Sequence, residues 1–130
     1  MPPTLMHTLH VELGDRGYPI LIGRGLLDDA HSLRPYIAGK QVAVISNTTV
    51  APLFMAPIRA ALGEAYTVTE VILPDGESFK TLDTVRGIFD DVLAAGHNRT
   101  TTFIALGGGV VGDMAGFAAA CYQRGVAFIQ

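Results

Sequence analysis

The sequence contains no tryptophan and a single cysteine, Cys121, among its 130 residues. One cysteine excludes an intrachain disulfide framework, and its apolar neighbours predict that Cys121 is a small core residue. Charged residues are also few, at 16%, and the nine lysines and arginines are scattered through a chain of net charge −3. A nucleic-acid-binding surface needs a clustered basic face, so we expect no nucleic-acid partner.

Long hydrophobic runs are missing as well. Asp113, Gln123 and Arg124 interrupt the most apolar region, which leaves no segment of membrane-spanning length. The amino terminus has no basic region ahead of an extended apolar stretch, which a secretory signal would require. We therefore expect no membrane partner and a cytoplasmic location.

Hydrophobic residues make up 49% of the chain, which is enough for one buried core, and we expect residues 1–130 to form a single domain. The alternating residues 4–13 and the apolar residues 18–22 flank a turn at residues 14–17. This pattern predicts an antiparallel hairpin at the edge of a sheet. Residues 26–37 have apolar positions at helical intervals and predict a short helix.

Strands and helices are predicted to alternate through the rest of the chain. Apolar stretches predict strands at residues 41–46, 66–73, 103–106 and 126–129, with helices at residues 50–62, 82–96 and from 110 onward. Such alternation with short connections is typical of the α/β class, in which a mostly parallel sheet is flanked by helices. We therefore predict a Rossmann-like fold preceded by the hairpin.

Three consecutive glycines, residues 107–109, separate the predicted strand at 103–106 from the helix that follows. Glycines let a ligand approach the backbone, and a helix amino terminus presents unpaired N–H groups, so this turn suits a diphosphate. Gly107, Gly109 and Gly112 match the pattern G-x-G-x-x-G, but no acid for a ribose follows about 20 residues later. Either residues from elsewhere bind the ribose, or the glycines only permit tight strand-to-helix packing.

Polar residues follow three of the predicted strands, at Asn47, in segment 75–80 and in segment 107–113. Ligands of parallel sheets bind beyond the carboxyl ends of the strands, so we expect these clusters to converge on one rim. In a ligand site, the carboxylates of segment 75–80 would accept hydrogen bonds from hydroxyl groups, and its lysine would lie beside phosphate. The structural alternative is a simple turn in which Glu77 and Ser78 stabilise a helix start.

Two charged residues mark the ends of the last predicted helix. Asp113, in its first turn, either complements the helix dipole or orients a ribose or nicotinamide group. Arg124, at the far end, either complements the carboxyl-terminal dipole or binds a phosphate with its planar guanidinium. The four histidines show no metal-ligand spacing, and we expect structural or solvated roles for them.

Two long motifs, LPDGESFKTL and ALGGGVVGDMAGFAAACYQRGVAFIQ, together with ISNTTVAPLF, resemble the 3-dehydroquinate synthases, a family of sugar phosphate cyclases. The similarity covers essentially the whole chain and implies an NAD-binding amino-terminal α/β domain. Arg124 resembles the family arginine that reaches the substrate phosphate, in the family from across a dimer interface. The residues that the resemblance assigns to NAD are Asn47, Asp75, Gly76, Glu77, Ser78, Phe79, Lys80, Gly109, Val110, Val111, Gly112 and Asp113.

The family chemistry implied by this resemblance converts 3-deoxy-arabino-heptulosonate 7-phosphate to 3-dehydroquinate and phosphate. NAD oxidises one ring hydroxyl, phosphate leaves by elimination, and the hydride returns, so NAD is not consumed. Zinc or cobalt polarises the reacting hydroxyl and is held by a carboxyl-terminal helical domain that this sequence lacks. We therefore expect a truncated chain that does not turn over alone, derived from an enzyme that is a homodimer.

Other interpretations share the same motifs. Another sugar phosphate cyclase, such as a deoxy-inosose or valiolone synthase, would differ mainly in residues that this chain does not contain. A glycerol or iron-type alcohol dehydrogenase also has a triple-glycine turn that ends in an aspartate, but it would consume NAD stoichiometrically. A third possibility is a non-catalytic module that only folds, associates or weakly binds nucleotide.

Overall fold

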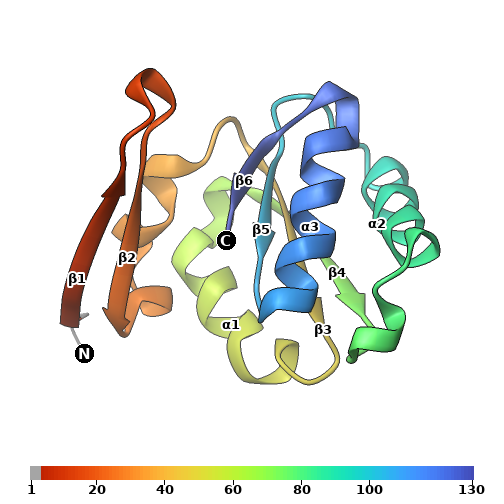
Figure 1. The fold of residues 1–130 in the computed structure, drawn as a ribbon, viewed down its shortest axis with the longest axis horizontal. Helices are drawn as coiled ribbons and strands as arrows, with labels where there is room; N and C mark the ends of the chain where they lie inside the picture. Colours follow the sequence, from red (N-terminus) through yellow and green to blue (C-terminus); the bar gives the residue numbers. More distant parts are fainter. Residues whose placement is uncertain (1–3) are drawn as a thin grey trace.

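A computed structural model describes residues 4–130 as a four-stranded parallel sheet covered by helices on both faces, beside a two-stranded hairpin (Figure 1). The strands are β1 (Thr4–Val11), β2 (Tyr18–Arg24), β3 (Gln41–Asn47), β4 (Thr67–Leu73), β5 (Thr102–Ala105) and β6 (Ala127–Ile129). The α-helices are α1 (Ala51–Leu62), α2 (Leu82–Ala94) and α3 (Gly109–Cys121).

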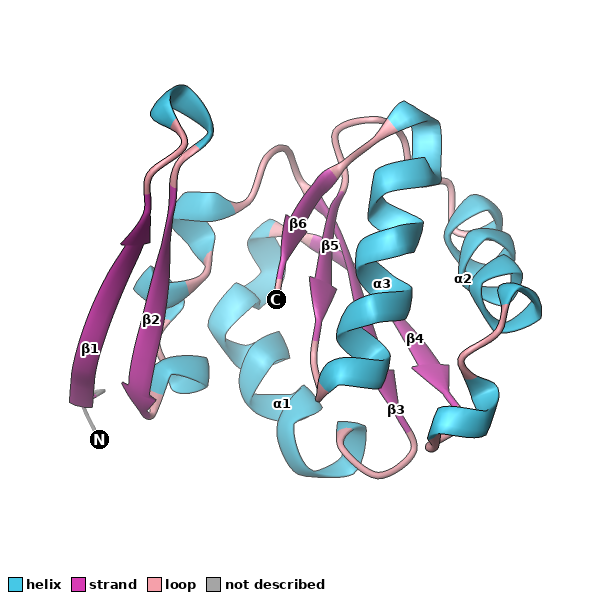
Figure 2. Ribbon diagram, in the orientation of Figure 1, coloured by secondary structure: helices cyan, strands magenta, loops and turns pink. Residues whose placement is uncertain are grey.

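The main sheet has the strand order β4-β3-β5-β6, and every neighbouring pair is parallel (Figure 2). Helix α1 joins β3 to β4, α2 joins β4 to β5, and α3 joins β5 to β6. The predicted α/β class and mostly parallel sheet are therefore confirmed.

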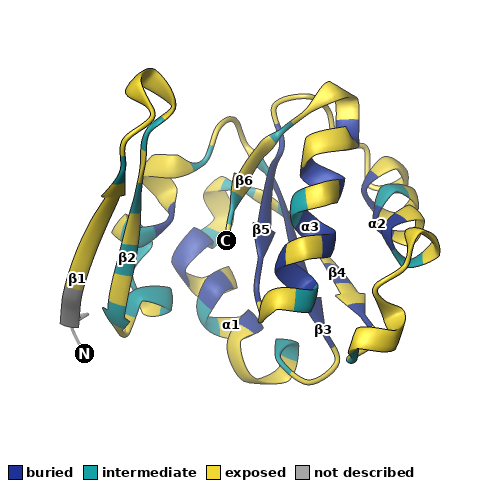
Figure 3. Ribbon diagram, in the orientation of Figure 1, coloured by how far each residue is buried: buried dark blue, intermediate teal, exposed yellow. Residues whose placement is uncertain are grey.

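Two hydrophobic cores, one on each face, hold the helices on this sheet. Alternate residues of β3 point to opposite faces, as the pleat of a strand requires. Val42 and Val44 pack in the core that contains α1, whereas Ala43 and Ile45 pack in the core of α2 and α3. β3 and β5 are buried on both faces (Figure 3), which explains why both read as unbroken apolar runs.

The amino-terminal hairpin forms as predicted, with β1 and β2 paired in antiparallel register. Its predicted position at the edge of the main sheet is wrong, because the two strands make a separate sheet. Alternation in β2 leaves one set of side chains exposed and the other half-buried. Leu21, of the half-buried set, lines a cavity together with Leu33 of the segment that links the hairpin to β3.

That linking segment is three short 3-10 turns, so the predicted helix at residues 26–37 is wrong. The backbone of Asp29 is extended, and its carboxylate accepts a hydrogen bond from the His31 N–H, which ends one turn and begins the next. Pro35 lacks the N–H that a longer helix would use. The Arg34 guanidinium donates to the carbonyls of Ala61 and Leu62 and so fixes the segment to the end of α1.

Cys121 is exposed, so the prediction of a core position is also wrong. The buried stripe of α3 runs through Val111, Ala115 and Ala118 to Tyr122 just beyond the helix, at helical intervals of three and four. Cys121 falls beside this stripe. Within residues 4–130, no helix is both long enough and apolar enough to cross a bilayer.

His97 is 4% exposed and has the structural role that the sequence predicts. Its two ring nitrogens lie 2.7 Å from the Thr101 hydroxyl and 2.8 Å from the Thr69 hydroxyl, and its carbonyl accepts a hydrogen bond from Tyr122. These contacts tie β4, α3 and the start of β5 together. Burial lowers the pKa of the His97 imidazole, because a charged ring would lose its hydration.

The buried imidazole predicts a pH-dependent stability. The unfolded His97 titrates near its ordinary pKa of about 6.5, whereas the folded ring resists protonation. The free energy of unfolding should therefore decrease as the pH falls from about 7.5 to about 5. Urea denaturation at the two pH values measures this decrease. In His97→Gln the free energy of unfolding should decrease less over this pH range, because the contribution of the imidazole is removed. A decrease equal to that of the unsubstituted chain would show that His97 is not responsible for it.

Candidate functional site

The connections after β3 and β5 leave the sheet toward opposite faces. The chain that follows β3 enters α1 on one face, whereas the chain that follows β5 enters α3 on the other. β3 and β5 are neighbours in the sheet, and in open α/β sheets loops that diverge in this way leave a crevice beyond the carboxyl ends of the strands. In open α/β sheets, this topological switch point is where ligands bind.

The glycine turn after β5 presents accessible backbone on one side of this crevice. A Cβ atom built on Gly108 or Gly109 would meet no atom within 4 Å, so the space above them is open. Hydrogen bonding of α3 begins with the Gly112 N–H, which donates to the Gly108 carbonyl. The N–H groups before it are at the positive end of the helix dipole, where an anionic diphosphate fits.

Asn47 and Thr49 hold the carboxylate of Asp75 at the same rim. The Asn47 Oδ1 accepts hydrogen bonds from the N–H groups of Thr49 and Val50, at 3.0 and 2.8 Å, and so stabilises the turn into α1. Its Nδ2 donates to Asp75 at 3.4 Å, and the Thr49 hydroxyl donates to the same carboxylate at 2.6 Å. The loops after β3 and β4 are thereby joined.

Lys80 joins the loop after β4 to Asp113 of α3, which lies just beyond the first turn of the helix, so the predicted first-turn position of Asp113 is wrong. Its ammonium lies 2.6 Å from the Asp113 carboxylate and 3.7 Å from that of Glu77. The hydrogen bond and charge of Asp113, with a smaller contribution from Glu77, raise the pKa of Lys80. The convergence of the three polar clusters on one rim is therefore confirmed.

A cavity of about 350 Å³ lies against this ion pair, between α2 and α3. It combines the two charged groups with the apolar side chains of Val85, Met114 and Phe117. Helix α2 itself is capped by Thr81, whose hydroxyl accepts a hydrogen bond from the Thr84 N–H. The alternative in which Glu77 and Ser78 start this helix is not seen, because they form a separate 3-10 turn.

Arg124 lies at the opposite end of α3 from the glycine turn. A helix of 13 residues is about 20 Å long, so in a single copy this side chain does not join the rim. Gln123 and Arg124 both have left-handed backbones, with φ of 49° and 66°. The predicted contact of Arg124 with a phosphate across a dimer interface stays a prediction.

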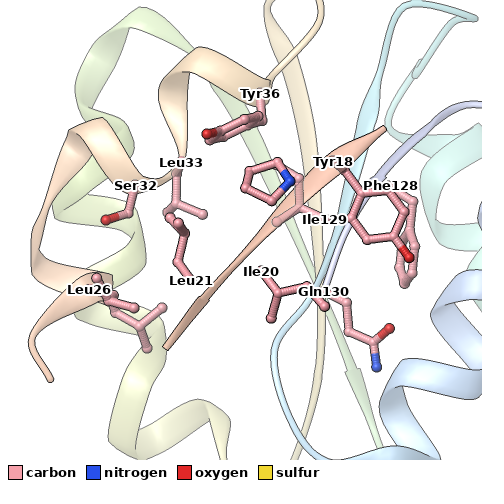
Figure 4. A pocket seen from close by; sticks show the side chains of 12 residues that line it. Tyr18, Ile20, Leu21, Leu26, Ser32, Leu33, Tyr36, Phe128, Ile129 and Gln130 are labelled. Atoms are coloured by element: carbon pink, nitrogen blue, oxygen red, sulfur yellow. The ribbon is translucent and has the colours of Figure 1, made fainter. Parts of the chain in front are cut away.

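A second cavity, of about 710 Å³, lies elsewhere, between the hairpin, the 3-10 segment and β6 (Figure 4). Apolar side chains such as Ile20, Leu33 and Phe128 dominate its walls. For a metal ion, the described residues contain no group of three or more histidine, cysteine, aspartate or glutamate side chains. In the described part of the chain, the polar groups therefore gather at the rim, and no such group of metal-ligating side chains accompanies them.

Two polar residues of the rim escaped the sequence analysis. Thr49 is one of them, and its hydroxyl orients Asp75. Gln130 follows β6 directly, and its carboxamide lies against Gly112. The signal available for Gln130 was its position as a polar residue at the carboxyl end of a predicted strand.

Comparison with known proteins gives consistent results. The family model for the amino-terminal part of 3-dehydroquinate synthase matches residues 70–130. The 3-dehydroquinate synthase of Pseudomonas putida (strain W619) is 62% identical over 125 residues, which are 96% of this chain and 34% of that protein. That of Pseudomonas fluorescens (strain SBW25) is 63% identical over the same share. The chain thus spans about a third of the length of these relatives.

Solved structures of related cyclases share the fold. A 2-deoxy-scyllo-inosose synthase complexed with carbaglucose-6-phosphate, NAD⁺ and Co²⁺ superimposes with a TM-score of 0.81 at 30% identity, covering 94% of this chain and 34% of that one. The second structure is ValA, the 2-epi-5-epi-valiolone synthase of Streptomyces hygroscopicus subsp. jinggangensis 5008 with NAD⁺ and Zn²⁺ bound. It superimposes with a TM-score of 0.67 at 26% identity, covering 81% of this chain and 29% of that one. These similarities and the Rossmann-like fold show that the chain belongs to the 3-dehydroquinate synthase family, of which it represents the amino-terminal part.

Proposed function

We propose that this chain is the dinucleotide-binding part of a 3-dehydroquinate synthase, which converts 3-deoxy-arabino-heptulosonate 7-phosphate to 3-dehydroquinate and inorganic phosphate. The observation that carries this proposal is 62% identity over nearly the whole chain to proteins of that name. The solved cyclases of other specificity are only 30% and 26% identical, which favours dehydroquinate synthesis over the related reactions.

The rim supports NAD as the cofactor of this reaction. The open backbone of Gly108 and Gly109 fits a pyrophosphate, and the Asp75 carboxylate, held by Thr49, can accept hydrogen bonds from ribose hydroxyls. Lys80 supplies a positive charge close to the same turn. NAD would supply reversible hydride transfer at one ring hydroxyl of the substrate, and these residues would fix its orientation.

The remaining parts of the enzyme belong to the same proposal. A divalent metal such as zinc or cobalt would be bound by residues outside the described part of this chain. We place the enzyme in the cytoplasm as a homodimer, with Arg124 reaching the substrate phosphate of the partner subunit. The isolated chain would then provide one wall of the active site and would not turn over alone.

A chimaera tests the assigned reaction. In this chimaera, the present chain replaces the matched 125 residues of the Pseudomonas putida synthase. The rate of phosphate release from the heptulosonate phosphate should stay within about tenfold of the rate of the unmodified Pseudomonas putida enzyme. The isolated chain, assayed with NAD⁺, zinc and substrate, should release no phosphate. A folded chimaera without activity would contradict the reaction, and activity of the isolated chain would contradict the requirement for further residues.

Substitution of Gly109 tests the pyrophosphate position. In Gly109→Val the new side chain would enter the space above the turn, where a Cβ atom meets nothing within 4 Å, and would displace a phosphate there. Calorimetric titration of this variant with NAD⁺ should show binding at least about tenfold weaker than that of the unsubstituted chain. Gly87→Val in α2, where a Cβ also meets nothing within 4 Å, is the matched control. Equal affinities of the two variants would place the pyrophosphate elsewhere.

Asp75 should select NAD⁺ over NADP⁺. A carboxylate that binds the ribose hydroxyls repels the 2′-phosphate of NADP⁺, so Asp75→Asn should lower the ratio of NAD⁺ to NADP⁺ affinity by about tenfold. The asparagine retains an oxygen that accepts from Thr49, so the loop stays in place. Titrations with both dinucleotides measure the ratio, with exposed Asp28→Asn as control. If Asp75→Asn leaves the ratio of NAD⁺ to NADP⁺ affinity unchanged, Asp75 does not bind the ribose.

A further inference from the structure

The carboxyl ends of the four parallel strands present their polar groups in a fixed linear order. Following the strand order β4-β3-β5-β6, these groups are Asp75, Asn47, the glycine turn at residues 107–109, and Gln130. The first two contact each other, and Lys80 connects the loop of Asp75 to Asp113 in the helix that follows the turn. Gln130, beyond the turn on the β6 side, has no role in the site as described so far.

A dinucleotide is also linear, with two nucleoside halves joined by the pyrophosphate. If the pyrophosphate lies on the glycine turn, the halves extend over the strands on either side of it. The Asp75 carboxylate, on the β4 side, suits the adenosine ribose. The nicotinamide riboside must then extend toward β6, where Gln130 follows the strand.

The pleat of β6 directs Gln130 toward α3. Ile129 packs in the core of α1, so its neighbours Phe128 and Gln130 point to the other face. A Cβ atom on Gly116 would lie 3.3 Å from the Phe128 ring, and one on Gly112 would lie 2.6 Å from the Gln130 Nε2. Glycine at position 112 therefore allows the carboxamide of Gln130 to lie against the first turn of α3.

The carboxamide is accessible and has the required chemistry. Gln130 is exposed, and although it borders the 710 Å³ cavity of Figure 4, its side chain points away from the cluster of Leu26, Leu33 and Tyr36. A glutamine carboxamide both donates and accepts hydrogen bonds. It can therefore pair with the carboxamide of nicotinamide or with the hydroxyls of its ribose, which also donate and accept.

We propose that Gln130 binds the nicotinamide-riboside half of the dinucleotide, an assignment that rests on the proposed NAD site. The carboxamide would fix that half on the β6 side of the glycine turn, opposite the adenosine half held by Asp75. Gly112 would serve this contact by leaving room for the side chain.

The test compares two ligands that differ by this half. NAD⁺ contains the nicotinamide riboside and ADP does not, and both contain adenosine and a diphosphate. In Gln130→Met, which keeps the length of the side chain but removes its polar end, calorimetry on the 130-residue chain should show about tenfold weaker NAD⁺ binding. ADP binding should remain within about twofold of the unsubstituted chain.

Two further variants separate this contact from a general effect. Gln123→Met, at the far end of α3, is the matched control and should change neither affinity. Gly112→Ala retains Gln130 but displaces its carboxamide, and it should weaken NAD⁺ binding selectively too. Circular dichroism of each variant verifies the fold.

Each outcome decides between the alternatives. A selective loss of NAD⁺ affinity in Gln130→Met supports the assignment. If the unsubstituted chain binds both ligands and Gln130→Met weakens both equally or neither, the role of Gln130 is overturned while the nucleotide site stands. If the unsubstituted chain binds neither ligand, the proposed site on this chain fails, and the role of Gln130 fails with it.

Discussion

Two neighbouring parallel strands, β3 and β5, send their helices to opposite faces of the sheet, and the whole candidate site depends on this divergence. If both helices lay on one face, their first turns would cover the carboxyl ends of the strands. Because they diverge, the Asn47 turn and the glycine turn stand on either side of an open crevice. The burial of both strands on both faces fixes these turns relative to each other.

The polar contacts at the rim orient the polar side chains of the candidate site and contribute little to the stability of the fold. Lys80 and Asp113 form a short ion pair, but both side chains are largely exposed, and such pairs contribute little to stability. The apolar side chains of β3, β5 and α3 hold the rim instead. This division of roles allows the charged residues of the rim to be substituted without unfolding the chain, which makes binding experiments interpretable.

Close approach of α3 to β6 is the second determinant of the site. Gly112 and Gly116 lie on the same side of α3, and each is contacted by a side chain of the β6 segment. A Cβ atom at Gly116 would press on the Phe128 ring, whereas one at Gly112 would displace only the end of the Gln130 side chain. The third glycine of the G-x-G-x-x-G pattern thus leaves room for a side chain that follows β6, in keeping with the close helix-to-strand packing of dinucleotide-binding folds.

The sequence by itself determined the α/β class, the strands and helices from residue 41 onward, and the convergence of Asn47, segment 75–80 and the glycine turn. These features follow from local patterns: apolar runs define buried strands, and polar residues at their ends must share one edge of a parallel sheet. The family also follows from the sequence, because its motifs are long and contiguous.

Only the tertiary structure decided the features that depend on packing between distant segments. The hairpin has the alternation of an edge strand, but it pairs only with itself, and residues 26–37 form 3-10 turns because Asp29 and Arg34 make contacts that periodicity does not encode. Cys121 has apolar neighbours in sequence, yet the rotation of α3 places it in solvent. Thr49 and Gln130 acquired their positions at the rim in the same way, since each is defined by a residue far away in the chain, Asp75 for one and Gly112 for the other.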